Sequence, residues 1–279
     1  MPFIPIDMAT STAKPGRPDG ARRLQPSPTG TRAVERAVLV LRVLAERGQH
    51  GWRISDLAAR VRLPLGTCHR ILDTLIRERL VIRVDEGARY RLGPLVPELA
   101  SARPGWIDLP GQVAPLLREL ARRHRAVAFL YARSGGDFVC LARENGVEMR
   151  ALAVERGTRR PLISSSGGAA MLVKLPAGER RAIVDGNFAQ LEAFGHDRIR
   201  GIRAMLRAST RCGYGLNLAQ VVAGVHSIGV AVLDPRDDAV VGAVVVSGAS
   251  EQFTLDAIRS ALPRCNEAAV RVGQLWMST

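Results

Sequence analysis

Residues 54–77 read ISDLAARVRLPLGTCHRILDTLIR, a pattern typical of two short amphipathic helices separated by a proline. Ser55 is placed to cap the first helix, and the segment at Pro64 ends it. The second helix is predicted over residues 65–79, and its apolar residues recur at helical spacing, so that one face is buried. That face consists of Cys68, Ile71, Leu72, Leu75 and Ile76.

The opposite face of this second helix carries side chains suited to a DNA groove. It presents Gly66, Thr67, Arg70, Asp73 and Arg77, with His69 at its edge. An arginine can form two hydrogen bonds to a guanine, and threonine or histidine can bind a base edge or a phosphate. The alternative is an ordinary solvated helix face, because exposed helices carry charged residues for solubility alone.

The flanking sequence extends this helix pair to a complete small domain. Upstream, a helix begins near Arg32, and Gly48 can end it. Downstream, residues 80–83 and 89–92 are predicted to pair as a hairpin around the turn DEGA. Three helices and a hairpin describe a winged helix-turn-helix. Further candidates for DNA contact are Arg53 and Ser55, and in the hairpin Arg89, Tyr90 and Arg91.

The net charge supports a nucleic-acid partner mainly through its position. The 279 residues include 40 basic and 26 acidic ones, a net charge of +14. Such a balance favours nucleic acid, an acidic lipid surface or anionic ligands. However, 38 of the 40 basic residues are arginine, a bias that raises the charge everywhere. Residues 32–92 hold 13 basic and 7 acidic residues, a net charge of +6, which favours double-stranded DNA as the partner.

Composition argues against several other classes of protein. Apolar residues make up 47%, too many for a disordered chain, and no run approaches the roughly 20 apolar residues of a membrane helix. The four cysteines lack metal-ligand spacing, so neither a metal nor a cofactor is expected. No nucleophile elbow, Walker lysine loop or dinucleotide fingerprint is present, so no catalytic residue is proposed and no enzyme is expected. Without a secretory signal, the expected location is the cytoplasm.

The chain divides into an arm, two domains and a connection. Residues 1–31 are rich in proline and are predicted to be disordered. The winged domain covers residues 32–93, a linker helix and connection residues 94–109, and a second domain residues 110–279. In the second domain, helices are predicted over residues 113–123, 169–175, 177–185, 199–211 and 254–276, and strands over residues 126–133, 138–144, 148–154, 224–233 and 240–248. Antiparallel hairpins with outer helices describe an α+β domain that senses a ligand.

The segment SSSGG over residues 164–168 is the candidate ligand site of the second domain. Hydroxyls and glycine amides just before a helix N-terminus favour an anion, since the helix dipole and the unpaired N–H groups both attract negative charge. The alternative is an ordinary serine-rich helix cap.

Several strings resemble the isocitrate lyase regulator (IclR) family of bacterial transcriptional regulators. They are LPLGTCHRIL at 63–72 and YRLG at 90–93, then GTRRPL at 157–162, GAAML at 168–172 and CGY at 212–214, in the order of the family. The resemblance implies a winged helix-turn-helix joined by a helix to a GAF-like α+β effector domain. It also implies a homodimer or homotetramer on operator DNA, with Thr67, His69 and Arg70 in the major groove. The alternative is a small-molecule sensor whose first domain contacts protein instead of DNA.

The resemblance also implies an effector pocket in the second domain. Its lining would come from Ser165, Ser166, Gly167, Gly168, Asn217, Ser227 and Ser247. This chain departs from the family pattern at Leu65-Gly66, where a Lys-Ser pair is common, and at Ile163, Ala169, Val245 and Ala219-Gln220, where polar or charged residues are frequent. The pocket is therefore expected to be less polar, and to take an aromatic or other organic acid in preference to a two- or three-carbon keto acid.

Overall fold

The computed structural model describes residues 31–46, 48–84, 88–102, 104–149, 152–191 and 196–277. The predicted arm lies outside these ranges except for Thr31, and the first three residues of the predicted DEGA turn also lie outside them. The first domain consists of α1 (Arg32–Ala45), η1 (Gly48–His50), β1 (Trp52–Arg53), α2 (Ile54–Val61), α3 (Leu65–Arg77), β2 (Val81–Val84) and β3 (Arg89–Leu92). Its strands form an antiparallel sheet of order β1-β3-β2.

The helices and strands of the first domain enclose one apolar core, in which α3 buries Cys68, Leu72 and Leu75. The predicted helix-turn-helix with its hairpin is therefore confirmed. The predicted cap at Ser55 is wrong, because α2 begins at Ile54 and Ser55 lies in its first turn. The helix α3 ends before the predicted residue 79, since Arg79 adopts a left-handed conformation with φ of 58°.

Two helices connect the domains. The first is α4 (Leu95–Ser101), and the second is α5 (Pro104–Arg123), which continues through Pro110 and Pro115. The sequence predicts a helix only from residue 113, so α5 begins earlier than expected. Proline at the first helical position is well tolerated because its missing N–H would have no partner there, and Pro104 therefore begins a helix instead of a loop.

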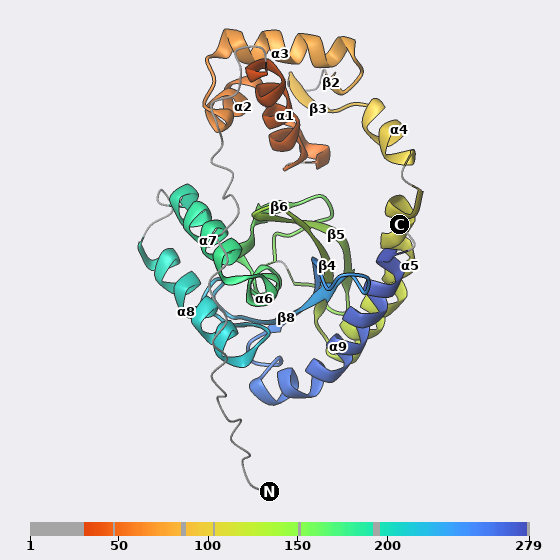
Figure 1. The fold of residues 1–279 in the computed structure, drawn as a ribbon, viewed down its shortest axis with the longest axis vertical. Coiled ribbons are helices and arrows are strands. Elements are labelled where there is room, and N and C mark those ends of the chain that lie inside the picture. The colour runs from red at the N-terminus through yellow and green to blue at the C-terminus, as the bar shows by residue number, and fades with distance from the viewer. Residues whose placement is uncertain are drawn as a thin grey trace, which may run out of the picture.

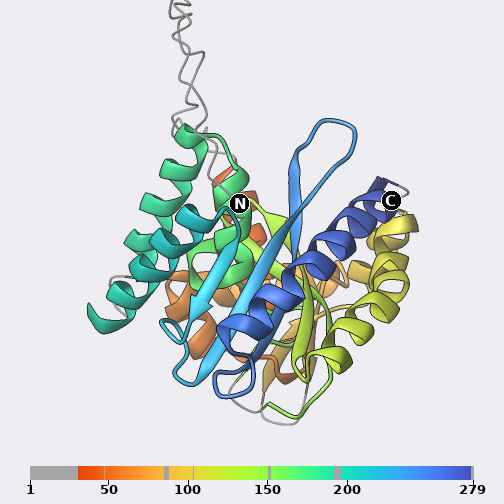
Figure 2. The same cartoon turned by 90° about the horizontal axis from the view of Figure 1, so that it is seen from below.

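The second domain is built on a six-stranded antiparallel sheet of order β6-β5-β4-β9-β8-β7. In chain order its elements are β4 (Val127–Ser134), β5 (Asp137–Asn145), β6 (Arg159–Pro161), η2 (Leu162–Ser164), α6 (Ser166–Lys174), α7 (Ala177–Leu191), α8 (His196–Cys212), β7 (Gly215–Leu218), β8 (Val225–Leu233), β9 (Val240–Ala249) and α9 (Leu255–Met277). Helices α5 and α9 cover one face of the sheet, and α6, α7 and α8 lie on the other (Figures 1 and 2). The α+β architecture predicted from the sequence is confirmed.

The strand predicted over residues 148–154 is wrong, because its described residues have no strand pairing. The guanidinium of Arg143 donates instead to the carbonyl oxygens of Leu152 (3.1 Å) and Val154 (2.8 Å). A side chain thus takes the place of a neighbouring strand for this segment. The third strand of this half of the sheet is β6, which pairs with β5.

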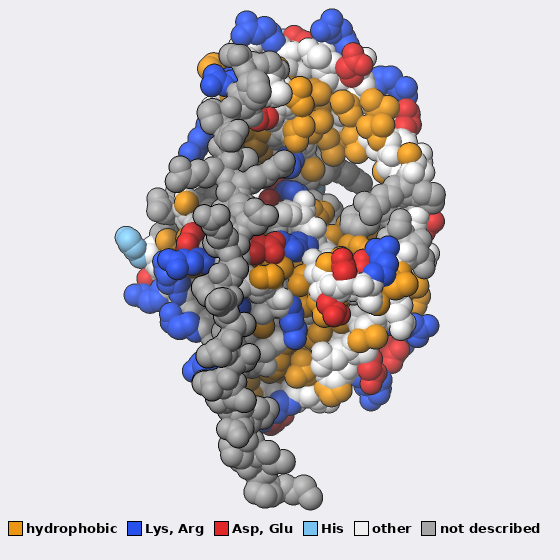
Figure 3. Space-filling view, viewed as in Figure 1, with side chains coloured by type: hydrophobic (Ala, Val, Ile, Leu, Met, Phe, Trp, Pro, Cys, Tyr) orange, Lys and Arg blue, Asp and Glu red, His pale blue; other side chains and the backbone are white. Residues whose placement is uncertain are grey.

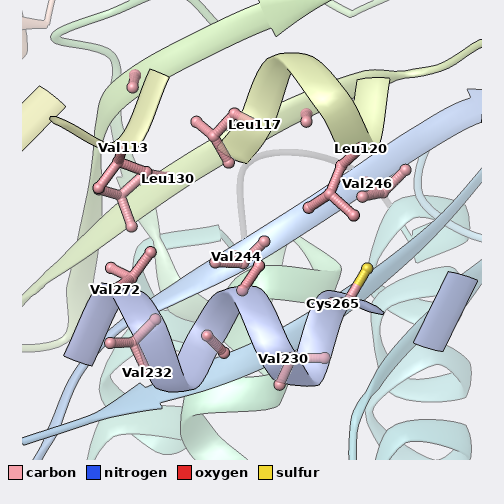
Figure 4. Packing of buried hydrophobic residues seen from close by; sticks show 14 of the residues in the cluster. Val113, Leu117, Leu120, Leu130, Val230, Val232, Val244, Val246, Cys265 and Val272 are labelled. Carbon is pink, nitrogen blue, oxygen red and sulfur yellow. The ribbon is translucent and has the colours of Figure 1, made fainter. Parts of the chain in front are cut away.

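Each face of the sheet has its own core, because alternate residues of a strand point to opposite sides. On β4, Phe129 and Tyr131 belong to the core beneath α6, and Leu130 belongs to the core beneath α5 and α9. Figure 4 shows the core between the sheet and helices α5 and α9, where Leu117 and Leu120 of α5 and Val272 of α9 pack against valines of β8 and β9. The helix α6 is therefore packed directly onto the sheet, which fixes the position of its N-terminus.

Two kinds of feature are not found in the described part of the chain. None of its helices combines the length and the apolar character that crossing a bilayer requires. No group of three or more histidine, cysteine, aspartate or glutamate side chains is placed to hold a metal ion there.

Candidate functional site

The outer face of α3 is free of the rest of the described chain. Gly66, His69, Arg70 and Asp73 are exposed, and Thr67 is half-buried. The helix lies on the edge of the first domain that faces away from the second domain (Figure 1). An exposed helix of this diameter can enter the major groove of DNA, which is about 12 Å wide.

Arg70 is the most available cation on this face. Its guanidinium has no ion pair or hydrogen bond among the described residues, whereas His69 Nδ1 lies 2.9 Å from Asp73 Oδ2, one helical turn along. Arg77 Nη2 donates to the hydroxyl of Thr74 at 3.4 Å. His69 and Asp73 therefore satisfy each other, and Arg70 is left to bind an external acceptor.

The predicted contacts in the hairpin need correction. Tyr90 is 5% exposed and packs into the core of the first domain, so it is not placed to touch DNA. Arg89 is half-buried, and its Nη1 donates to the carbonyl oxygens of His50 (3.2 Å) and Gly51 (3.4 Å). Arg91 is also half-buried. Arg53 and Ser55 are exposed, as a phosphate contact would require.

A second site is a cavity of about 110 Å³ in the second domain, between the sheet and the N-terminus of α6. Five of the predicted effector residues line it, namely Ser165, Ser166, Asn217, Ser227 and Ser247. Its other walls are mainly apolar and come from Phe138, Leu152, Ala153, Val154, Val221, Val222 and Val225, with Ser164 and Arg160 completing the lining. The cavity thus combines an apolar body with a cluster of hydroxyls, as ligand sites commonly do.

Gly167 and Gly168 do not line this cavity, although the sequence predicts that they do. A Cβ on Gly168 would lie 1.8 Å from the carbonyl oxygen of Leu162, and one on Gly167 would lie 2.4 Å from Val245 Cγ2. These glycines are needed for close packing of α6. The amide of Gly168 donates to the hydroxyl of Ser165 at 3.0 Å, so Ser165 caps the helix and this amide is not free for an anion.

Most of the polar side chains in the cavity are held in place by hydrogen bonds. The hydroxyl of Ser166 donates to the hydroxyl of Ser227 at 2.8 Å. Asn217 Nδ2 donates to the carbonyl oxygen of Val225, and Asn217 Oδ1 accepts from the amide of Val221. Ser166, Asn217 and Ser227 are all buried. A rigid, hydrogen-bonded wall of this kind favours recognition of a defined ligand, because little ordering is left to be done on binding.

Arg160 is a polar lining residue that is not among the residues predicted from the sequence. It is half-buried, and among the described residues it is the one charged side chain that lines the cavity. Its Nη2 donates to the carbonyl oxygen of Ala153 at 2.6 Å, and it has no acidic partner in the described part of the chain. Burial lowers the pKa of Arg160 below its usual value, a shift that Tyr131 opposes and Arg198 reinforces.

The alternation of β6 explains why Arg160 faces the cavity. The preceding Arg159 points to the other side of the strand, where it binds Asp137 (3.1 Å) and Ser134. The sequence signal that could have found Arg160 is its place in the string GTRRPL at 157–162, just before the serine-rich segment.

Comparisons with known proteins match both domains. The family model described as the IclR helix-turn-helix domain matches residues 33–85, and the model of the bacterial transcriptional regulator IclR C-terminal domain matches residues 106–273. The HTH-type transcriptional repressor AllR of Klebsiella pneumoniae is 26% identical over 251 residues, covering 88% of this chain and 90% of that protein.

Solved structures of similar fold include an IclR transcriptional regulator from Silicibacter sp. TM1040, with a TM-score of 0.70, 22% identity and coverage of 87% of this chain and 95% of that one. An IclR homologue from Microbacterium hydrocarbonoxydans, solved in complex with 4-hydroxybenzoate, has a TM-score of 0.63 and 22% identity. The match includes 88% of this chain and the whole length of the Microbacterium protein.

Proposed function

Because the chain belongs to the IclR family of bacterial transcriptional regulators, we propose that α3 reads an operator and that the cavity of the second domain binds an organic acid that modulates this reading. Binding would take place in the bacterial cytoplasm, where chromosomal DNA lies. The observation that carries the effector half of the proposal is the half-buried Arg160, which lies beside the serine hydroxyls and has no acidic partner in the described part of the chain.

The DNA contacts follow from the exposed face of α3. Arg70 is free to form two hydrogen bonds to a guanine, and Thr67 and His69 can reach a neighbouring base edge or phosphate. Arg53 and Ser55 would contact the backbone from the start of α2. Backbone contacts fix the register of the helix on DNA, and Arg70 supplies the discrimination.

The effector class follows from Arg160 and the cavity walls. A half-buried guanidinium that has no acidic partner among the described residues loses part of its hydration, and a bound carboxylate would compensate for this through charge-assisted hydrogen bonds. A volume of about 110 Å³ is below the roughly 150 Å³ that holds a benzene molecule. An acid with one aromatic ring therefore requires the apolar walls of this cavity to move outward as it binds. The relative solved with 4-hydroxybenzoate supports an acid of this class.

The assembly we propose is a homodimer through α1, with pairing to a tetramer as a further step. Val34, Val38 and Leu39 of α1 are exposed by 64%, 41% and 40%. Figure 3 shows hydrophobic side chains gathered on the side of the first domain that carries α1. A second copy packed there would bury this apolar surface and pair two reading helices.

The test is binding of the full chain to the intergenic DNA beside its own gene, followed by fluorescence anisotropy. We expect salt-sensitive, sequence-selective binding, which benzoate or 4-hydroxybenzoate alters. The absence of selective binding to any flanking DNA would contradict the DNA half. Selective binding that no small organic acid changes would contradict only the effector half.

A further inference from the structure

A second, larger cavity of the second domain lies between α6, α7 and α8. Its volume is about 740 Å³, and it shares no lining residue with the cavity that contains Arg160. Its floor is apolar and is formed by Ala169, Leu172, Val173, Val184 and Leu206. Its rim carries four arginines, Arg180, Arg181, Arg207 and Arg211, together with Thr210 and one acidic residue, Asp185. We call this feature the outer groove.

The positive charge of the domain is concentrated beside the outer groove. Residues 104–279 contain 22 basic and 16 acidic residues, a net charge of +6. The helix α8 alone contains five arginines and one aspartate, a net charge of +4. The remainder of the domain is therefore nearly balanced, and a general excess of arginine does not explain α8. Figure 3 shows basic side chains gathered at the edge formed by α7 and α8.

The arginines of α8 form a stripe, because residues 200, 203, 207 and 211 recur every three or four positions. Towards the start of the helix they have partners: Arg200 pairs with Asp197 at 2.5 Å, and Arg203 stacks over the ring of Phe188. Arg207 and Arg211, which line the groove, have no ion pair among the described residues. Arg180 across the groove has none there either, and Arg181 has only a 3.7 Å contact with Asp185.

Arg180, Arg207 and Arg211 have no ion pair among the described residues and surround an apolar floor, an arrangement that calls for a ligand with two kinds of surface. An inorganic anion or a DNA backbone would satisfy the charges but would gain nothing from Leu172, Val184 and Leu206. A neutral apolar molecule would leave the arginines unpaired. The volume lies within the range of roughly 300–1,000 Å³ that small-molecule sites occupy.

We propose that the outer groove is a binding site for an amphipathic anion, whose carboxylate, sulfonate or phosphate group lies between Arg207, Arg211 and Arg180. Its hydrocarbon body lies on the apolar floor. The floor includes the C-terminal half of α6, and the N-terminus of the same helix carries Ser165 and Ser166 of the effector cavity. A ligand in the outer groove therefore contacts the same helix, α6, whose N-terminus lines the effector cavity.

The test uses 8-anilinonaphthalene-1-sulfonate, an amphipathic anion whose fluorescence rises in apolar sites, titrated into the full chain. Octanoate is then added as a competitor, with 1-octanol as its uncharged counterpart. We expect octanoate to displace the probe at least tenfold more effectively than 1-octanol. Equal displacement by the two would overturn the proposal, because the arginines would then have no part in binding.

Matched variants locate the probe. Arg207→Ser combined with Arg211→Ser is expected to weaken probe binding at least tenfold, whereas Arg259→Ser combined with Arg271→Ser, two exposed arginines of α9, leaves it unchanged. Circular dichroism melting checks that both variants fold. Equal loss in both pairs would overturn the proposal. So would loss of probe binding in Ser227→Leu, which would place the probe in the effector cavity.

Two further measurements separate other occupants from a small anion. If the α8 variant binds the probe normally but changes the oligomeric state in size-exclusion chromatography, the groove is an interface between copies and the proposal is wrong. If that variant keeps probe binding but lowers the salt dependence of operator binding, the arginines contact DNA, and the proposal is again wrong.

Discussion

At the scale of single residues, Arg70 is the side chain that we propose discriminates between DNA sequences. We predict that Arg70→Ala lowers the preference for operator over random DNA by roughly 1–3 kcal/mol, the value of a bidentate contact to a base. The measurement is fluorescence anisotropy with two labelled duplexes of equal length.

Arg70→Lys is the control, because it keeps the charge and loses the planar fork. We expect it to lose most of the discrimination and to keep the salt dependence of binding, which Arg70→Ala reduces. An equal loss of affinity on both duplexes in Arg70→Ala would mean that Arg70 touches only phosphate.

Arg160 is the corresponding residue of the effector cavity. We predict that Arg160→Gln weakens binding of benzoate at least tenfold and leaves binding of the neutral benzamide unchanged, because only the carboxylate gains a charge-assisted contact. Isothermal titration calorimetry measures both. Arg156→Gln is the control, since Arg156 is exposed in the preceding loop. The same loss in both variants would remove Arg160 from the site.

At the scale of elements, the position of α6 depends on glycines that let it approach the sheet. A Cβ on Gly229 of β8 would lie 2.6 Å from the carbonyl oxygen of Ser166 and 2.8 Å from the amide of Gly167. We predict that Gly229→Ala lowers the free energy of unfolding by about 1–3 kcal/mol, the usual cost of overpacking. It should also weaken ligand binding, because Ser166 moves with α6.

Gly186→Ala is the matched control for this prediction. Gly186 lies in α7, and a Cβ there would have no atom within 4 Å. Alanine in an open helical position stabilises by about 0.5–1 kcal/mol relative to glycine. Urea denaturation of both variants checks the signs. A neutral or stabilising effect of Gly229→Ala would show that α6 does not depend on this contact.

The end of α5 makes stability depend on pH through His124. Burial lowers the pKa of His124 from its usual 6.5, and the charges of Arg123 and Arg264 lower it further. Its folded-state pKa is therefore depressed, so the unfolded chain binds the proton more readily. The neutral histidine stabilises the fold above pH 6.5, and this contribution is lost as the pH falls towards the folded-state pKa.

We predict that His124→Phe reduces the fall in the free energy of unfolding between neutral and mildly acidic pH. Phenylalanine suits the site because His124 already meets the ring of Phe253 edge-on. Urea denaturation at several pH values measures the slope. An unchanged slope would mean that other groups control the pH dependence in this range.

The sequence predicts an element well where one periodicity dominates. The exposed and buried faces of α3 follow directly from its helical spacing. The β6 strand could not be predicted, because only three residues form it and the preceding segment is held by the side chain of Arg143. The prediction that Tyr90 contacts DNA beside Arg89 and Arg91 is wrong because alternate residues of a strand face opposite sides. Arg160 was missed because its direction depends on the register of β6.

At the scale of the whole molecule, the proposed homodimer would hold two reading helices at a fixed spacing. We predict that Val34→Asp combined with Val38→Asp converts the dimer to a monomer and weakens operator binding, because these exposed residues of α1 lie one turn apart. Analytical ultracentrifugation measures the assembly. Val270→Asp is the control, since Val270 of α9 is also 64% exposed. An intact dimer in the α1 variant would place the interface elsewhere.

The two domains must also be coupled in both directions. An effector that weakens operator binding must itself bind less tightly to the DNA complex, by the same factor. The effector cavity and the outer groove both contact α6, so two ligands on one helix would influence each other in the same reciprocal way.

The most direct test is the affinity of the full chain for operator and scrambled duplexes, measured between about 50 and 200 mM salt. If two subunits each neutralise about three phosphates, the log–log slope is roughly −5, and the operator is preferred by about 10³ or more. Equal affinities for the two duplexes, at every salt concentration, would contradict a regulator that reads its operator through α3.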